Sequence, residues 1–236
     1  MKFVNWNCNG AFRNKYLEIA SLDADIYIIQ ECENPELSNH KDYIEWSKNY
    51  LWIGDNKNKG IGVFAKEGIL LEALDWDSNY EGHRVKLFLP ILINKSYQLL
   101  AVWTHRNNSP NFGYIGQMWK YLKINKERFK DILIIGDLNS NSIWDQWDRW
   151  WNHTDVINEL KEQEIESVYH YINKEEQGKE KTPTFFLYRN IDKGYHIDYF
   201  LIKSKWLENI RSYEIKQRDF WLKYSDHIPQ LLEINI

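Results

Sequence analysis

Six short polar groups, each on or just after an apolar run, carry residue types that are typical of a hydrolytic site. They are Asn7 and Asn9 in VNWNCNG, Glu31 in IYIIQE, His105 in LLAVWTH, Asp137 and Asn139 in ILIIGDLN, His196 and Asp198 in YHIDYFLI, and Asp226 and His227 in YSDHIPQ. Buried strands have no reason to end in carboxylates, amides and imidazoles unless these groups meet. We therefore expect all six groups to share one pocket. Together they suit a hard divalent metal ion and a phosphate ester.

GDLN at 136–139 is the sharpest single motif. Gly136 allows a tight exit from the apolar strand before it, and Asp137 then projects where that strand ends. Asn139 follows on the same side by the period-two alternation of extended chain. A carboxylate can orient and activate a water, and a neutral amide can donate to a phosphate oxygen. Taken alone, the motif fits a turn equally well, because Gly, Asp and Asn favour turns.

The tripeptide Ser225-Asp226-His227 is the second motif. Adjacent side chains of extended chain point to opposite sides, so His227 can face substrate while Asp226 reaches a metal or a supporting group. A histidine of near-neutral pKa is a suitable proton carrier, and Asp198 is the candidate carboxylate that holds its tautomer. The alternative for the tripeptide is a cap or surface turn before the last strand.

Glu31 ends the run IYIIQ, where a buried carboxylate requires a partner. A magnesium ion is the natural partner, since Mg²⁺ prefers one or two carboxylates, with water and substrate phosphate completing its shell. Glu33 is the competitor on the same face, and we expect it to be more exposed. Asn7 lies near Glu31 if the first two strands are neighbours, which short connections favour.

Weaker candidates follow two other strands. His105 closes LLAVWT and is followed by Arg106; it fits either a phosphate contact or an ordinary polar strand end. Arg84 fits either an inward support for the carboxylates or an exposed strand arginine. We expect the remaining histidines at the surface or in loops, namely His40, His83, His153 and His170.

The periodicity of apolar residues predicts a strand-heavy chain with interspersed helices. Helices are expected at 14–22, 41–49, 112–124 and 154–161, the last with Thr154 as its N-cap, and a charged loop at 173–181. Strands are expected at 3–6, 25–30, 59–66, 69–75, 84–89, 97–104, 131–135, 184–186, 197–202, 209–216 and 228–235. The mixture favours an α/β (α+β) fold of two packed sheets with helices outside. A one-sheet hydrolase is the structural alternative.

Length and composition limit the classes of protein. The 236 residues fit a single domain, 1–236, and an apolar content of 43% is enough for a sizeable core. We see neither a segment that could span a membrane nor a secretory signal. Cys8 and Cys32 are the only cysteines and are expected to be reduced and structural, which favours a cytoplasmic location. A net charge of −4 argues against a strongly electrostatic nucleic-acid binder but does not exclude a nuclease.

The assembled residues resemble the endonuclease/exonuclease/phosphatase superfamily, which includes exonuclease III-like apurinic endonucleases, pancreatic deoxyribonuclease, sphingomyelinases and inositol-polyphosphate phosphatases. The resemblance spans almost the whole chain, with the family's motifs in order. They are matched by Trp6 to Gly10, Gln30 and Glu31, Gly136 to Asn139, Asp198 and Tyr199, and Ser225 to His227.

The resemblance implies a four-layer α/β sandwich and a phosphoesterase that depends on Mg²⁺ (or Mn²⁺). Its implied roles are metal binding by Glu31 with help from Asn7 and, nearby, Asp226. Asp137 aligns the attacking water and Asn139 holds the phosphate. His227, oriented by Asp198, handles the proton or stabilises the developing charge.

Some residues depart from the family pattern and bear on the substrate. His105 stands where the apurinic-endonuclease branch tends to carry a tyrosine, and it looks more like the deoxyribonuclease, sphingomyelinase and deadenylase branches. The family's Glu-Gly-Arg element appears with one residue inserted, as Glu81 to Arg84. Thr184 and Phe185 resemble a short Thr-aromatic strand near substrate. The candidate substrate-binding residues are Asn9, Arg84, Arg106, Thr184 and Phe185.

The first hypothesis is a monomeric nuclease that hydrolyses phosphodiester bonds of nucleic acid, with DNA only slightly preferred over RNA. The alternative is a phosphatase or phosphodiesterase of a small molecule or lipid headgroup that uses the same site. A catalytically silent binding module is disfavoured, because every expected polar position is occupied.

Overall fold

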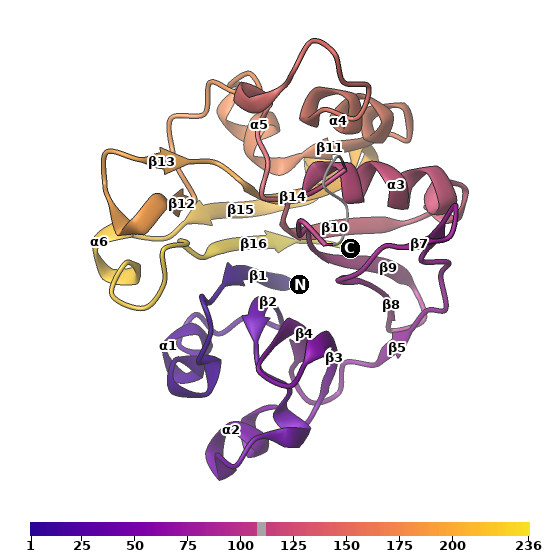
Figure 1. The fold of residues 1–236 in the computed structure, drawn as a ribbon. Coiled ribbons are helices and arrows are strands. Elements are labelled where there is room, and N and C mark those ends of the chain that lie inside the picture. The colour runs from indigo at the N-terminus through magenta and orange to yellow at the C-terminus, as the bar shows by residue number, and fades with distance from the viewer. Residues whose placement is uncertain (108–111) are drawn as a thin grey trace.

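The computed structural model describes residues 1–107 and 112–236, and two six-stranded β-sheets dominate it (Figure 1). In spatial order, the first sheet contains β15 (Ile210–Ile215), β16 (Gln230–Ile234), β1 (Lys2–Asn7), β2 (Ile26–Cys32), β4 (Lys59–Ala65) and β3 (Tyr50–Asn56). The second contains β11 (Ile165–Ser167), β14 (Asp198–Lys203), β10 (Ile132–Asp137), β9 (Tyr97–Trp103), β8 (Phe88–Ile93) and β5 (Leu71–Ala73).

Two small hairpins and several helices surround the sheets. The hairpins are β6 (Asn79–Tyr80) with β7 (His83–Arg84), and β12 (Phe185–Phe186) with β13 (Gly194–Tyr195). The α-helices are α1 (Tyr16–Ala20), α2 (Lys41–Trp46), α3 (Ile115–Asn125), α4 (His153–Glu162), α5 (Val168–Asn173) and α6 (Arg218–Trp221). The 3-10 helices are η1 (Phe12–Asn14), η2 (Pro35–Leu37), η3 (Lys126–Arg128), η4 (Ser142–Trp144), η5 (Leu187–Arg189) and η6 (Ser204–Asn209).

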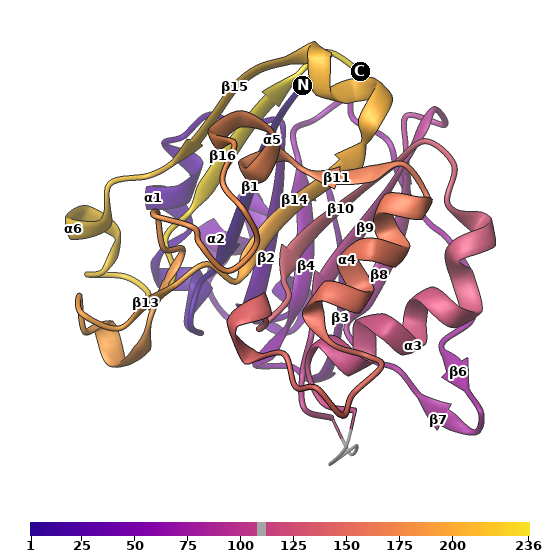
Figure 2. The same cartoon turned by 90° about the horizontal axis from the view of Figure 1, so that it is seen from above.

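Three apolar layers separate four layers of secondary structure. The middle layer joins the facing sides of the two sheets through residues such as Phe3, Ile28, Leu99 and Leu133. A second packs α3 and α4 on the outer face of the second sheet, and a third packs α1 and α2 on the first. Figure 2 shows these helices on opposite sides of the paired sheets. The expected four-layer α/β sandwich is confirmed.

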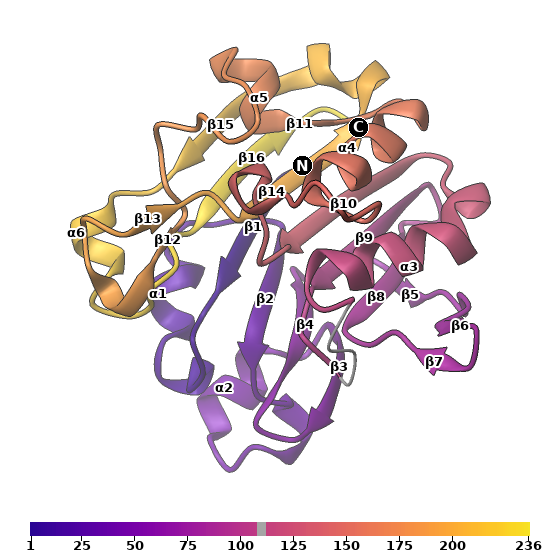
Figure 3. The same cartoon turned by 45° about the horizontal axis from the view of Figure 1, so that its top comes forward.

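The strand order explains why distant residues meet. β1 runs parallel to β2, and β9 runs parallel to β10. β1 and β10 also pack on each other across the middle layer, so the last residues of both strands, Asn7 and Asp137, lie together. The two ends of the chain lie side by side at another part of the sandwich (Figure 3), where the Met1 ammonium donates to the Ile234 carbonyl at 2.6 Å.

Gly136 is required by the close approach of β9 to β10. Its φ is 157°, and a Cβ at this position would lie 1.8 Å from the Val102 carbonyl oxygen. No side chain fits that space. The glycine of the GDLN motif therefore permits the two parallel strands to pair up to the residue that carries the carboxylate.

The observed elements match most of the predicted ones, with differences where local patterns are weak. The strand predicted at 84–89 is split between β7 and β8, and β3, β11, α5 and α6 were not predicted. The prediction of Thr154 as N-cap of α4 was wrong. Asn152 is the cap, and its backbone N–H donates to Asp155 at 2.8 Å in a capping box. Within the described ranges, no helix combines the length and the apolar character needed to cross a membrane.

Candidate active site

The carboxyl ends of β1, β2 and β10 bring Asn7, Glu31 and Asp137 into one hydrogen-bonded group. Asn7 Nδ2 donates to Asp137 Oδ2 at 3.0 Å and to Glu31 Oε1 at 3.4 Å. Glu31 has a left-handed φ of 61° at a register shift between β2 and β4, so its side chain leaves the regular alternation of the strand. The expected proximity of Asn7 and Glu31 is confirmed by the direct pairing of β1 with β2.

Asp137 is fully buried and accepts hydrogen bonds on both oxygens. Oδ1 accepts from the Asn139 backbone N–H at 2.7 Å, and Oδ2 accepts from Asn139 Nδ2 at 3.0 Å. Asn139 has a left-handed φ of 44°. Its side chain therefore returns to Asp137 through a tight turn, and the period-two alternation proposed from the sequence does not apply there.

His227 and Asp198 form a buried pair beside this group. His227 Nδ1 lies 3.0 Å from Asp198 Oδ2, and its other ring nitrogen, Nε2, lies 4.0 Å from Asp137 Oδ2. Ser225, the first residue of the tripeptide, fixes the segment, because its hydroxyl donates to the Asn7 carbonyl at 2.7 Å and accepts from the His227 N–H at 3.1 Å. The structure thus places Asp198 in hydrogen-bond contact with the imidazole, and its orienting role stays a prediction.

Burial and mutual charge shift the pKa values of the two central groups. Burial, with the nearby Asp198 charge, raises the pKa of Asp137 to about 7 against the opposing charge of His227. Burial lowers the pKa of His227, but the Asp198 charge and hydrogen bond and the Asp137 and Asp226 charges together raise it to about 9. At neutral pH, His227 is therefore a cation with two N–H donors, and Asp137 is poised to exchange a proton.

These shifts predict that the unfolding free energy without divalent metal falls as pH rises. A raised folded-state pKa stabilises below the unfolded-state pKa, and that stabilisation is lost as pH passes the folded-state pKa. For His227 the stabilisation is lost between pH 6.5 and about pH 9, and the loss amounts to roughly 3 kcal/mol. Asp137, whose folded-state pKa is raised to about 7, also loses stabilisation as the pH rises toward that value. Urea unfolding in EDTA at pH 6.5 and at about pH 9 measures this loss of unfolding free energy. His227→Gln should show a flatter profile, and a flat wild-type profile would contradict the assignment.

The donor set fits a hard divalent cation. One atom each from Asp137, Asp198 and His227 lie within 4.8 Å of one another, and Glu31 adds a carboxylate that is 18% exposed. A cation bound beside the fully buried Asp137 would lower its raised pKa further, as the charge of His227 already does in part. The Asn7 amide presents its nitrogen to both carboxylates, so its role as a metal ligand, which requires the oxygen, stays a prediction.

Two residues near the site were not assigned from the sequence. Lys59, at the start of β4, places its ammonium 2.6 Å from Glu31 Oε2. Only the pairing of β2 with β4 reveals this contact. Ser225 was recognised as part of a motif, but its hydrogen bonds to β1 give it a positioning role.

Thr184 and Phe185 support the His227 pair. Thr184 is buried, and its hydroxyl accepts from the backbone N–H of Ile197 and of Asp198, both at 3.1 Å. The Phe185 ring centroid lies 4.6 Å from that of His227. Thr184 therefore fixes the start of β14, and Phe185 forms one wall beside the imidazole.

The other predicted residues lie around this centre. Asp226 is half-buried, and its carboxylate accepts from the Ser225 hydroxyl at 3.4 Å. Asn9 is exposed, and its N–H donates to Asn7 Oδ1 at 3.0 Å. His105 is exposed, and its Nδ1 accepts from the Asn107 N–H at 3.1 Å. Arg106 is exposed and lines a pocket that includes Asn139.

The structure corrects several expectations. Arg84 is exposed on β7 and, among the described residues, its guanidinium forms no ion pair with the carboxylates; of its two alternatives the exposed strand arginine holds, and substrate binding by Arg84 stays a prediction. Glu33 is 5% exposed rather than open to solvent; it accepts from the Phe12 and Arg13 N–H groups at 2.8 and 3.0 Å. His153 is buried, not at the surface.

His196 is also buried but bonds to the Thr182 carbonyl at 3.0 Å, so it does not join the shared pocket. The expectation that all six polar groups meet was therefore wrong for this histidine.

Comparison with known proteins supports the fold. No family model matches the chain, and no curated protein matches it. An AP endonuclease from Archaeoglobus fulgidus has a TM-score of 0.74 at 15% identity over 100% of both chains. The 3′ phosphatase NExo from Neisseria, solved with a product DNA hairpin, has a TM-score of 0.72 at 15% identity over 100% of both chains. The APE2 catalytic domain from Xenopus laevis has a TM-score of 0.67 at 17% identity over 99% of this chain and 91% of its own.

These structures define the fold class. The chain has the two-sheet sandwich fold of exonuclease and AP endonuclease structures, as the motif order predicted. At these identities the likeness concerns the fold, and the chemistry of the site must be argued from its own residues.

Proposed function

We propose that the chain is a divalent-metal-dependent hydrolase of phosphodiester bonds that acts on nucleic acid, with DNA as its preferred substrate. One observation carries the proposal: Asp137 is hydrogen-bonded to both Asn7 and Asn139, and its Oδ2 lies 4.0 Å from Nε2 of His227, which pairs with Asp198. The NExo structure with a product DNA hairpin supports the choice of nucleic acid. Proton carriers, amide donors and metal-binding carboxylates are the groups that hydrolysis of a phosphate ester requires.

Each side chain has a role that its position supports. The Asp137 carboxylate holds and deprotonates the attacking water, since its pKa of about 7 suits a general base at neutral pH. Asn139 Nδ2 and the cationic His227 Nε2 donate to the non-bridging phosphate oxygens, whose charge grows in the transition state. Asp198 keeps the imidazole in place through Nδ1. Asp137 ends β10 and Asp198 begins β14, so both carboxylates are held by rigid elements.

Glu31, with Asn7 beside it, is the proposed holder of Mg²⁺ or Mn²⁺. A metal ion bound there would neutralise phosphate charge and polarise the ester. Lys59 contacts Glu31 Oε2 at 2.6 Å, so a metal ion bound there would displace this ammonium or take the other oxygen, Oε1.

We predict that Glu31→Gln weakens Mn²⁺ binding by about 10-fold or more, because it removes a charged ligand. Electron paramagnetic resonance titration of free Mn²⁺ measures this without any assay of activity. Glu33→Gln is the matched control two residues away. It should keep Mn²⁺ affinity within about 2-fold but lower the melting temperature, because Glu33 accepts the Phe12 and Arg13 N–H groups. If Glu33→Gln weakened Mn²⁺ binding and Glu31→Gln did not, the metal would be assigned to Glu33.

The test of the function is a substrate panel with Mg²⁺ or Mn²⁺: supercoiled DNA, an abasic duplex, RNA and several phosphomonoesters. Glu31→Gln and His227→Ala, purified in the same way, serve as controls for contaminating nucleases. Cleavage of nucleic acid that both variants lose supports the proposal. Turnover of small phosphate esters alone would indicate the alternative, a small-molecule or lipid-headgroup phosphatase. No turnover of any substrate would indicate a binding module.

We also propose that the chain is a single domain that acts as a cytoplasmic monomer. The two cysteines, Cys8 and Cys32, are free and buried, which is consistent with a reducing compartment. Size-exclusion chromatography with light scattering tests the monomeric state.

A further inference from the structure

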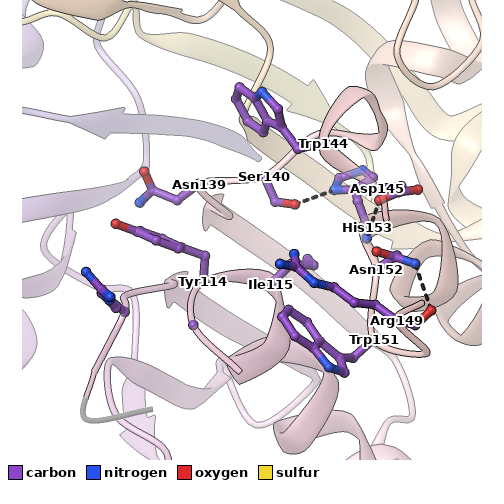
Figure 4. Close-up of a pocket in the computed structure, with 12 residues that line it drawn as sticks. Tyr114, Ile115, Asn139, Ser140, Trp144, Asp145, Arg149, Trp151, Asn152 and His153 are labelled. Atoms are coloured by element: carbon purple, nitrogen blue, oxygen red, sulfur yellow. Dashed lines mark hydrogen bonds between the residues drawn. The ribbon is translucent and has the colours of Figure 1, made fainter. Parts of the chain in front are cut away.

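A pocket of about 510 Å³ opens beside Asn139 and is separate from the carboxylate group. Its volume is in the range of roughly 300–1,000 Å³ that is usual for small-molecule sites. We call it the arginine–tryptophan pocket, after the residues that define it: Arg106, Tyr114, Asn139, Trp144, Arg149 and Trp151. Figure 4 shows Trp144 and Tyr114 on either side of the Asn139 side chain, with Arg149 across the pocket over Trp151.

The lining of the pocket has two arginines, Arg106 and Arg149, against the carboxylate of Asp145, so it carries net positive charge. Within residues 1–107 and 112–236, neither Arg106 nor Arg149 forms an ion pair; the Arg149 guanidinium lies 4.7 Å from the Trp151 ring centre. The acidic residue of the pocket, Asp145, accepts from the His153 N–H at 2.8 Å at the start of α4, which points its carboxylate at the helix and leaves its charge in place. Guanidinium groups without acidic partners are typical of phosphate recognition.

The pocket also joins an aromatic row that begins at the candidate active site. Phe185 lies 4.6 Å from His227, Tyr195 lies 6.5 Å from Phe185, and Trp144 lies 5.1 Å from Tyr195, between ring centroids. Three tryptophans in the segment 144–150 are exposed: Trp144 at 44%, Trp147 at 98% and Trp150 at 64%. Of these three, Trp144 lines the pocket, and its half-exposed indole offers a face on which a base can stack.

We propose that the arginine–tryptophan pocket binds unpaired nucleotides of a single-stranded segment next to the scissile phosphate. This rests on the proposed function, because the occupant is the nucleic acid that the site cleaves. Bases stack on aromatic faces only when they are free of their own neighbours in a duplex. Arg106 and Arg149 contact the backbone phosphates, Trp144 and Tyr114 contact the base, and Asn139 connects the pocket to the phosphate under attack.

The test measures binding in EDTA, where no metal-dependent cleavage occurs, by anisotropy of a labelled 12-nucleotide single strand and of the same sequence as a duplex. We expect the single strand to bind at least about 10-fold more tightly. Trp144→Leu should weaken single-strand binding about 5- to 100-fold, and Trp144→Phe should restore most of it. Arg149→Gln should reduce the slope of log affinity against log salt by about 0.7, the value of one lost phosphate contact.

Leu70→Ala is the matched control, an exposed apolar residue before β5, beside the turn between β8 and β9. It should bind as the wild type does, and melting temperatures of all variants verify that they fold. Equal binding of duplex and single strand, or no effect of Trp144→Leu, would overturn the proposal. Vesicles of phosphatidylserine and phosphatidylcholine test a lipid surface as the alternative partner of the exposed tryptophans. Trp144-dependent binding to vesicles but not to DNA would also overturn the proposal.

Hydrolysis of bis(p-nitrophenyl) phosphate with Mn²⁺ separates this inference from the proposed function. If wild-type protein cleaves this small diester but does not bind the single strand, the pocket assignment fails and the phosphodiesterase chemistry stands. If the single strand binds in a Trp144-dependent way and no diester is cleaved, the pocket assignment stands and the catalytic proposal fails.

Discussion

Asp137→Asn should lower turnover by about 100-fold or more with the fold intact. The substitution removes the carboxylate that contacts both Asn7 and Asn139, and an amide cannot take a proton from water. Removal of a positioned acid or base costs typically 10²–10⁴-fold. The measurement is kcat on the best nucleic acid substrate at saturating Mn²⁺, with a melting curve to verify folding.

Asp131→Asn is the matched control, because Asp131 directly precedes β10 and Asp137 is its last residue. The Asp131 carboxylate is half-exposed and pairs with Lys205, so its loss should leave kcat within about 2-fold, as exposed ion pairs contribute little. A near-normal rate for Asp137→Asn would remove Asp137 from the mechanism, even if the other site residues prove essential.

The second large effect is expected at His227. His227→Ala should lower kcat by about 10²–10⁴-fold, since it removes the cationic donor whose Nε2 faces Asp137. Asp198→Asn alone should lower kcat by about 10-fold or more, because the amide no longer holds the imidazolium by charge.

The double variant His227→Ala/Asp198→Asn distinguishes an Asp198 that orients His227 from an Asp198 that acts directly in catalysis. The Asp198 carboxylate reaches the site through His227 Nδ1, at 3.0 and 3.2 Å. Once His227 is alanine, Asp198→Asn should therefore change kcat by no more than about 2-fold. Additive losses would show instead that Asp198 acts on metal or substrate directly, as its membership of the Asp137–Asp198–His227 group allows.

Much of the fold was predictable, because strand and helix signals are local. The fully apolar run before Gly136 became the buried strand β10, and most of the long helix and strand patterns were recovered with small shifts at their ends, although the seven-residue β3 was missed. Short elements such as β11 and α6 were missed because three or four residues carry too little periodicity. The cap of α4 was misplaced because Asn152 and Thr154 have the same local preference.

Several of the predicted site residues lie together in the structure, but the sequence did not predict which of them touch. Glu31 and Glu33 are two residues apart and chemically equal, so their sequence spacing cannot distinguish them. The register shift between β2 and β4 decides the matter: it turns Glu31 toward Asn7 and Lys59, while Glu33 binds backbone N–H groups near η1. The pocket at Arg149 and Trp144 had no assigned role in the sequence, because its walls come from four separate segments.

The sequence by itself determined which strands end in polar residues and what chemistry those residues offer, since both follow from residue type and nearest-neighbour pattern. The tertiary structure alone decided which of them touch: the packing of β1 on β10 joins Asn7 to Asp137, and antiparallel pairing of β10 with β14 places Asp198 level with Asp137. Contacts of this kind depend on the packing of residues far apart in the chain, which no local pattern encodes.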